Sequence, residues 1–206
     1  MVTEQFKKKL DQFLLAFGIS LMIGIMVLGQ DFRDSLGSAM SVIMDPVVTI
    51  LGASNFHIVL FIMASITALY ASLIQKYTID WDLMRNTQEK MKGFQKEFRE
   101  AQLSNNTALT KKMEEERKDM MQDQMEMSKQ QFKPMAYISI ISLPLFMWAY
   151  HYIRAHEGAS LVFPFWGQQI LTDTVLGPFQ HWIFWYFISS LAVSQLIRKA
   201  LDVGGV

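Results

Sequence analysis

The sequence has no cysteine among its 206 residues, and it has few charged residues. Without cysteine, the chain can form no disulfide, no thiolate metal site and no cysteine nucleophile. Only 18% of the residues are charged while 51% are hydrophobic, a balance that argues against a soluble enzyme core. The net charge is zero, so the basic excess typical of nucleic-acid-binding proteins is also missing. We therefore predict that nucleic acid is not a partner.

The sequence also lacks the common motifs of catalysis. It contains no G-x-S-x-G motif, no phosphate-binding loop and no Asp or Glu pair inside an apolar run. The four histidines, His57, His151, His156 and His181, do not have a metal-binding spacing. We therefore expect no catalytic residue, no metal site and no cofactor, and we expect that the protein is not an enzyme.

The charges that are present gather in one third of the chain. Residues 76–133 hold 12 of the 19 Lys and Arg residues and 11 of the 19 Asp and Glu residues. Long uncharged runs remain on both sides of this block. Such a distribution is typical of a membrane protein that carries one polar insert.

Four runs without Asp, Glu, Lys or Arg approach or reach the roughly 20 helical residues that cross about 30 Å of hydrocarbon. They are residues 12–30, 56–75, 134–153 and 178–197. Four spans would place both termini on one side of the membrane. The first run has a second interpretation, because Lys7, Lys8 and Lys9 followed by an apolar stretch also resemble a cleaved signal peptide.

Positive residues predict the orientation of these spans. With the N-terminus in the cytoplasm, 17 of the 19 Lys and Arg residues lie inside, and only Arg33 and Arg154 lie outside. Lys and Arg are enriched in the cytoplasmic loops of membrane proteins. We therefore predict a multi-pass protein of the plasma membrane with both termini and the polar insert in the cytoplasm.

Two external segments are too apolar for simple loops. In residues 31–55, apolar side chains recur every three or four positions, as in an amphipathic helix lying in the membrane interface, and Pro46 is expected to break this helix in two. Residues 155–177 are apolar and aromatic but too short to span, which indicates an interfacial or re-entrant segment with Trp166 near the headgroups.

The polar insert, residues 77–133, reads as a helical hairpin. Met84, Met91 and Phe98 are seven residues apart, as in a coiled coil, and Phe94 and Ala101 supply the alternate seam positions. The stretch 104–107 interrupts the pattern as a helix stop and N-cap would. We predict two antiparallel helices in the cytoplasm. Their mixed charges fit a solvated coiled-coil exterior or, alternatively, an electrostatic contact with a ribosome or another partner.

Methionines crowd the second half of this hairpin on more than one helical face. Methionine is flexible and suits the recognition of varied apolar segments. Two interpretations stay open here, ordinary packing and a client-capture surface. The candidate capture residues are Met120, Met121, Met125, Met127 and Met135.

Uncharged polar residues lie mostly in the inner halves of the last three spans, while the outer halves are apolar. One interpretation is that small hydroxyl side chains let helices pack closely and that long polar side chains reach the interface. The other is a groove, open to the cytoplasm, that ends partway across the bilayer. The candidate groove residues are Ser72, Gln75, Lys76, Ser139, Ser142, Ser190, Ser194, Gln195 and Arg198.

The order of these parts resembles the YidC/Oxa/Alb superfamily of membrane-protein insertases, most closely its archaeal YidC-like branch, which is related to the third subunit of the ER membrane complex. The residues that carry the resemblance are 95–101, 125–135, Pro164 with Phe165, and 185–199. The resemblance covers about residues 56–204. The first span is an addition to the three-helix core of that superfamily.

The resemblance implies an insertase or chaperone that moves short or single-span clients into the bilayer without nucleotide hydrolysis. Its partners would be newly made hydrophobic segments, the lipid bilayer and other subunits of an insertion complex. Bacterial members place an arginine within the groove, whereas the candidate cations here, Lys76 and Arg198, lie near the cytoplasmic boundary. An ion-conducting channel, or a scaffold that tethers a soluble partner through the hairpin, remain the alternatives.

The predicted fold class is all-α, a polytopic membrane protein with a three-helix insertase-type core. The expected boundaries are a membrane helix at 1–30, an external interfacial segment at 31–55, a membrane helix at 56–76, the hairpin at 77–133, a membrane helix at 134–154, a second external segment at 155–177, and a last membrane helix with its tail at 178–206.

Overall fold

The computed structural model describes residues 2–103, 107–156 and 158–204, and 84% of these residues are helical. Its contacts divide it into two compact units, a membrane unit of residues 1–76 and 136–204 and an arm unit of residues 77–135. The bounds of the arm unit nearly match those of the polar insert expected at 77–133, although helix α5 contributes residues to both units. The predicted all-α class is confirmed.

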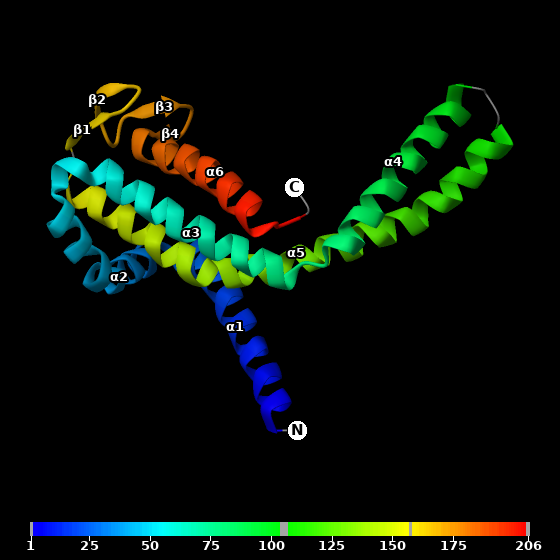
Figure 1. The fold of residues 1–206 in the computed structure, drawn as a ribbon, viewed down its shortest axis with the longest axis horizontal. Helices are drawn as coiled ribbons and strands as arrows, with labels where there is room; N and C mark the ends of the chain where they lie inside the picture. Colours follow the sequence, from blue (N-terminus) through cyan, green and yellow to red (C-terminus); the bar gives the residue numbers. More distant parts are fainter. Residues whose placement is uncertain (1, 104–106, 157, 205–206) are drawn as a thin grey trace. The chain divides into compact units, whose positions relative to one another are not determined.

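In the residues that the structure describes, six α-helices and one short 3₁₀-helix make up most of the fold (Figure 1). They are α1 Val2–Val27, α2 Gly29–Leu51, η1 Ala53–Asn55, α3 Phe56–Thr78, α4 Trp81–Leu103, α5 Thr107–Ala155 and α6 His181–Leu201. The expected interruption at 104–107 falls largely outside the described residues, because only Thr107, the first residue of α5, is described.

Within the described ranges, four helices are long and apolar enough to cross a membrane. They cover Glu4–Val27, Gly29–Leu51, Ala53–Thr78 and Glu116–Ala155. Among the described residues, the helices of this length and apolar character therefore include α2, which was expected to lie in the membrane interface. They do not include α6, which was expected to span the membrane. Helix α6 has 21 residues, but its Trp, Tyr, Ser and Gln side chains lower its mean hydropathy.

Proline does not end either of the helices in which it was expected to mark a boundary. The predicted break at Pro46 is wrong, because α2 continues from Gly29 to Leu51 with Pro46 inside it. Pro134 likewise lies within the 49-residue helix α5, where the sequence suggested a join between hairpin and membrane helix. Proline removes one backbone hydrogen bond and can kink a helix, but the bonds on either side can carry the helix past it.

The second external segment folds into strands that the sequence did not predict. Strands β1 (Ser160–Phe163) and β2 (Gly167–Ile170) form one antiparallel hairpin, and β3 (Thr174–Leu176) and β4 (Phe179–Gln180) form another. We call residues 158–180 the outer cap, after the external position that the sequence predicts for them. The amide of Trp182 donates to the carbonyl of Leu171 and that of His181 to the carbonyl of Asp173, so the cap is fastened to the start of α6.

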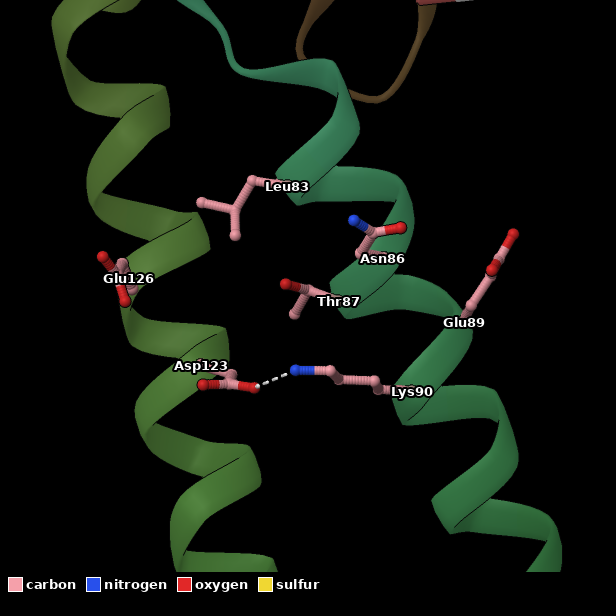
Figure 2. A pocket seen from close by; sticks show the side chains of 7 residues that line it. All are labelled: Leu83, Asn86, Thr87, Glu89, Lys90, Asp123 and Glu126. Atoms are coloured by element: carbon pink, nitrogen blue, oxygen red, sulfur yellow. Dashed lines mark ion pairs between the residues drawn. The ribbon is translucent and has the colours of Figure 1, made fainter.

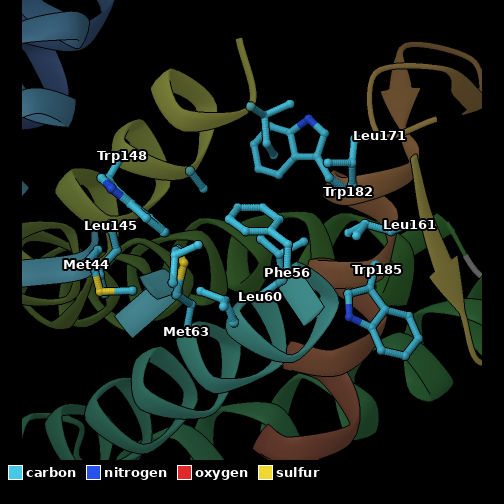
Figure 3. Close-up of a cluster of buried hydrophobic side chains, with 14 of the residues drawn as sticks. Met44, Phe56, Leu60, Met63, Leu145, Trp148, Leu161, Leu171, Trp182 and Trp185 are labelled. Carbon is cyan, nitrogen blue, oxygen red and sulfur yellow. The ribbon is translucent and has the colours of Figure 1, made fainter. Parts of the chain in front are cut away.

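The core of the membrane unit is an apolar cluster where α2, α3, α5, α6 and the outer cap meet (Figure 3). Aromatic rings link its helices: Phe56 of α3 stacks on Tyr152 of α5 at 4.8 Å between centroids, and Phe146 of α5 contacts Trp182 of α6 at 5.1 Å. Leu161, Phe163 and Leu171 of the cap are each less than 5% exposed. The cap is therefore part of the core, which explains why its strands are short and partly apolar.

The arm unit pairs α4 with the first part of α5 as two antiparallel helices. The amide of Asp80 donates to Gln130, and farther along α4 Lys90 forms an ion pair of 3.6 Å with Asp123, which is earlier in α5 (Figure 2). Ala101, one of the predicted seam positions, is buried, and the other four, Met84, Met91, Phe94 and Phe98, are half-buried. Thr87, also buried, lies fourteen residues before Ala101 and so falls on the same heptad seam.

Candidate client groove

The apolar cluster occupies only one half of the membrane unit. Along α3 its last member is Met63, along α5 the one nearest the arm is Leu145, and along α6 the last is Trp185. From Met63 to the end of α3 at Thr78, about 22 Å of helix contributes no residue to the cluster. The three helices thus share a tight aromatic core at the end next to the outer cap and lack that core at the other end.

Polar contacts join α3 and α6 at this second end. The guanidinium Nη2 of Arg198 donates to Oε1 of Gln75, and Nζ of Lys76 donates to the carbonyl of Leu201 at 2.7 Å. The second bond caps one of the free carbonyls that every helix leaves at its C-terminus. The structure therefore brings three predicted groove residues, Gln75, Lys76 and Arg198, together where α3 and α6 end. We call these three residues the polar mouth.

The six remaining candidate groove residues differ in their surroundings. Ser72 is buried in α3, at 1% exposure. Ser142 and Ser194 are half-buried, and their hydroxyls donate to carbonyls of their own helices, those of Ile138 and Leu191. Ser190 is half-buried and Gln195 is exposed on α6. Ser139 is buried against α1.

The contact of Ser139 with α1 was not predicted. Its hydroxyl lies 3.0 Å from the carbonyl oxygen of Gly18 and 2.7 Å from that of Ala136. A Cβ atom at Gly18 would collide with the Ala136 carbonyl, so glycine is what permits this close approach. Tyr137 donates to the carboxylate of Asp11 beside it. The first helix is therefore held by polar bonds against the first residues of α5 that belong to the membrane unit.

Two tyrosines that the sequence did not single out lie between the helices. Thr67 of α3 donates to the carbonyl of Met63, and its oxygen lies 2.9 Å from the hydroxyl of Tyr186 of α6. Tyr70 donates to the carbonyl of Tyr137 of α5 at 3.1 Å. A tyrosine in an apolar run needs a partner for its hydroxyl, and this feature of the sequence could have predicted these contacts between helices. These bonds lie beyond the last residues of the apolar cluster, on the side of Gln75 and Arg198.

The candidate capture methionines lie on several faces of α5. Met121 and Met125 are each 58% exposed, Met135 is 45% exposed, and Met120 and Met127 are half-buried. Met120 and Met121 also line a hollow of about 490 Å³ between the two arm helices, together with Met91, Phe94 and Phe98. This hollow has flexible apolar walls and is the part of the arm unit best suited to hold an apolar side chain.

Among the described residues there is no group of three or more His, Asp or Glu side chains placed to hold a metal ion.

One protein family matches most of the sequence. The sequence pattern of the family described as integral membrane protein EMC3/TMCO1-like matches residues 41–205, about four fifths of the chain.

The chain belongs to the EMC3/TMCO1-like family. This family is part of the Oxa1/YidC/Alb3 insertase superfamily, so the protein is an integral, multi-pass membrane protein of that superfamily. The match begins within α2 and covers α3, the arm unit, the outer cap and α6. No curated protein and no solved structure matches the sequence.

Proposed function

We propose that this EMC3/TMCO1-like protein is a membrane insertase and chaperone. It moves short or single-span clients into the bilayer through a polar groove between α3, α5 and α6, without nucleotide hydrolysis. The observation that carries the proposal is the one-sided core: the apolar cluster ends at Met63, Leu145 and Trp185, and beyond it α3 and α6 are joined through Gln75 and Arg198.

A one-sided core fits insertion better than conduction. Moving an unpaired polar group into hydrocarbon costs several kcal/mol, and polar partners at half depth lower that cost for the flank of a client. A channel needs polar groups along the whole path. Here the other half of the three helices is filled by Phe56, Trp148 and Trp182, each at most 1% exposed. The aromatic half therefore acts as the closed end of the groove.

The contacts of α2 support an interfacial position for this helix. Asp34 approaches His151 at 3.7 Å, and Asp45 accepts a hydrogen bond from Trp148 at 2.8 Å. The α2 residues are about 16 Å apart along their helix, but their partners are only about 5 Å apart along α5. Helix α2 thus crosses α5 steeply. If α5 spans the membrane, α2 lies near its plane, with Val42 and Ile50 exposed for contact with lipid.

The arm supplies the first contact with the client. In the topology that the positive residues favour, both termini and the arm unit are in the cytoplasm of a cell whose plasma membrane holds the protein. The exposed Met121, Met125 and Met135 and the hollow beside Phe94 then receive newly made hydrophobic segments. A ribosome or other insertion-complex subunits would contact the charged faces of the arm. We place the chain in the archaeal YidC-like branch on the motifs given above.

Insertion into liposomes tests the proposed function. The purified protein, reconstituted with a single-span client, should yield a protease-protected client fragment. No gain over protein-free liposomes would contradict the proposal, and a conductance in a planar bilayer would favour the channel. The variant Gln75→Leu with Arg198→Leu removes the polar mouth and should reduce insertion several-fold. The matched control Leu196→Ala changes a side chain of α6 that is 70% exposed and should insert as the natural protein does.

Crosslinking locates the client. Because the chain has no cysteine, single cysteines can be introduced without first replacing natural ones. Ser142→Cys and Ser190→Cys should crosslink to a stalled client, whereas Leu196→Cys on the exposed side of α6 should crosslink to lipid. Equal client crosslinking at all three positions would show that the client does not use the groove.

The arm can be tested separately. Met121→Ser with Met125→Ser removes two exposed apolar side chains, so client binding before insertion should weaken by several-fold. The control Gln122→Ser with Gln131→Ser changes two exposed polar positions of the same helix that do not line the hollow. Equal client binding by both double variants, measured by crosslinking in detergent, would assign the methionines to ordinary packing.

A further inference from the structure

A cavity of about 500 Å³ lies at the end of the membrane unit that carries the outer cap. It opens between the last turn of α5, the cap and the first turn of α6. Ile153 and Trp182, which are 2% and 1% exposed, belong to its wall, and Arg154, Thr172 and Asp173 add polar groups to the lining. One wall is therefore apolar and buried, and the remainder offers one positive and one negative side chain.

Arg154 is held ready for a ligand. Its guanidinium lies over the ring of Tyr150, 5.7 Å from the centroid, a cation–π arrangement that orients the planar group. Within the part of the chain that the structure describes, no carboxylate lies within 4 Å of it. A guanidinium on an aromatic face keeps N–H donors at its edge, and these suit the oxygens of a phosphate.

Arg33 and Arg154 differ in what their guanidinium groups contact. These two are the cations expected on the side of the membrane that carries the cap. The guanidinium of Arg33 donates from Nε and Nη2 to the carbonyl of Ile25, at 3.1 and 3.0 Å, and so supports the turn between α1 and α2. Arg154 has no such bond to a carbonyl among the described residues. Its charge is thus available at the cavity.

Asp173 supplies the opposite charge. Its backbone carbonyl accepts a hydrogen bond from the amide of His181 and lies 2.9 Å from Nδ1 of that residue, which fixes the turn after β2. Its side chain is exposed and lines the same cavity as Arg154. A ligand that places a cation a few ångströms from a phosphate would satisfy both residues.

We propose that this cavity binds the headgroup of a phospholipid that carries a phosphate and a primary ammonium group. Arg154 and the hydroxyl of Thr172 bind the phosphate, and the carboxylate of Asp173 binds the ammonium. Ile153 and Trp182 contact the apolar part of the lipid next to the headgroup. The position favours a lipid over a free phosphate ester, because helix ends rich in Trp and Tyr lie at the headgroup level of a bilayer. Such a lipid would occupy the joint between α5, α6 and the outer cap.

Binding to the delipidated, full-length protein in detergent tests the site. The probes are dioctanoyl phosphatidylethanolamine, dioctanoyl phosphatidylglycerol, dioctanoylglycerol and soluble phosphoethanolamine. The first should bind more tightly than the second, and the third should bind most weakly. Arg154→Gln should weaken both phospholipids about tenfold. Asp173→Asn should remove the preference for the ammonium headgroup without weakening phosphatidylglycerol.

Asp31→Asn is the matched control, since Asp31 is exposed on α2 outside the cavity. It should leave all affinities unchanged, and the melting temperature without lipid verifies that each variant folds. If Arg154→Gln binds both lipids as tightly as the control Asp31→Asn does, the phospholipids do not bind in this cavity. If phosphoethanolamine binds as tightly as the lipid, the ligand is a soluble phosphate ester and the lipid assignment is overturned. If the ethanolamine lipid has no advantage over phosphatidylglycerol, the role of Asp173 is overturned.

Discussion

Single polar atoms on large aromatic side chains connect the helices of the membrane unit. Trp148 of α5 donates to Asp45 of α2, and Trp185 of α6 donates to the backbone carbonyl of His57 of α3, at 2.8 and 2.9 Å. Tyr186 reaches Thr67 in the same way. Tryptophan and tyrosine bury a large apolar area and also need a partner for one polar atom. Each such bond therefore fixes how far two helices can slide past one another.

The bond between Thr67 and Tyr186 gives a prediction at this scale. Thr67→Val and Tyr186→Phe each remove one partner with little change in volume. The free energy of unfolding in mixed micelles should show a coupling of about 0.5–1.5 kcal/mol in a double-mutant cycle. A coupling near zero would show that the two hydroxyls do not interact in the folded protein. Ser65→Ala, which removes a hydroxyl bonded within α3, is the control and should not couple with Tyr186→Phe.

At the scale of elements, the steep crossing of α2 over α5 depends on a small residue. A Cβ atom at Gly37 would lie 2.9 Å from both the carbonyl oxygen of Met147 and Cβ of His151. The contact involves backbone, which cannot move aside as a flexible side chain can. Gly93 in α4 has no atom within 4 Å of the same position and so serves as a matched position in an open helix.

We predict opposite effects of the two glycine replacements. Gly37→Ala should destabilise the protein by about 1–3 kcal/mol, because the added methyl group forces α2 away from α5. Gly93→Ala should stabilise the arm by about 1 kcal/mol, because alanine favours a helix more than glycine does. Loss of helical circular dichroism in increasing denaturant measures both. Stabilisation by Gly37→Ala would mean that α2 does not pack closely on α5.

The sequence predicted the elements with strong local signals and missed those that depend on distant contacts. The arm helices and α3 follow from composition and charge. The strands of the outer cap do not, because Leu161 and Phe163 are held in place by a cluster whose other members come from four separate helices. The continuation of α5 through Pro134 was also missed, since a proline only weakens a helix and its surroundings decide whether the helix ends.

At the scale of the whole molecule, orientation is the property on which the groove depends. Of the 19 Lys and Arg residues, 17 fall on one side in the proposed topology. The groove opens to the cytoplasm only if this assignment is correct. Phe165, 88% exposed at the turn of the first hairpin of the cap, would then face the outer interface, where aromatic side chains are common.

Labelling of intact cells tests the orientation. Gln168→Cys in the outer cap should react with a membrane-impermeant maleimide from outside the cell. Lys96→Cys in the arm should react only after the membrane is opened, because the positive residues keep the arm inside. Both positions are exposed, so burial does not limit either reaction. The reverse pattern would place the arm and the proposed groove on the outside.

The sequence by itself determined that this is a polytopic helical membrane protein with a charged helical arm, because hydrophobic length and charge distribution are properties of the chain alone. It also located the polar ends of α3 and α6. Only the tertiary structure decided which of those residues meet. Gln75 and Arg198 are 123 positions apart and form a bond, while Ser139 turns to α1 and Ser72 is buried. Helical periodicity determines the face on which a side chain lies, but packing of distant helices determines what that face contacts.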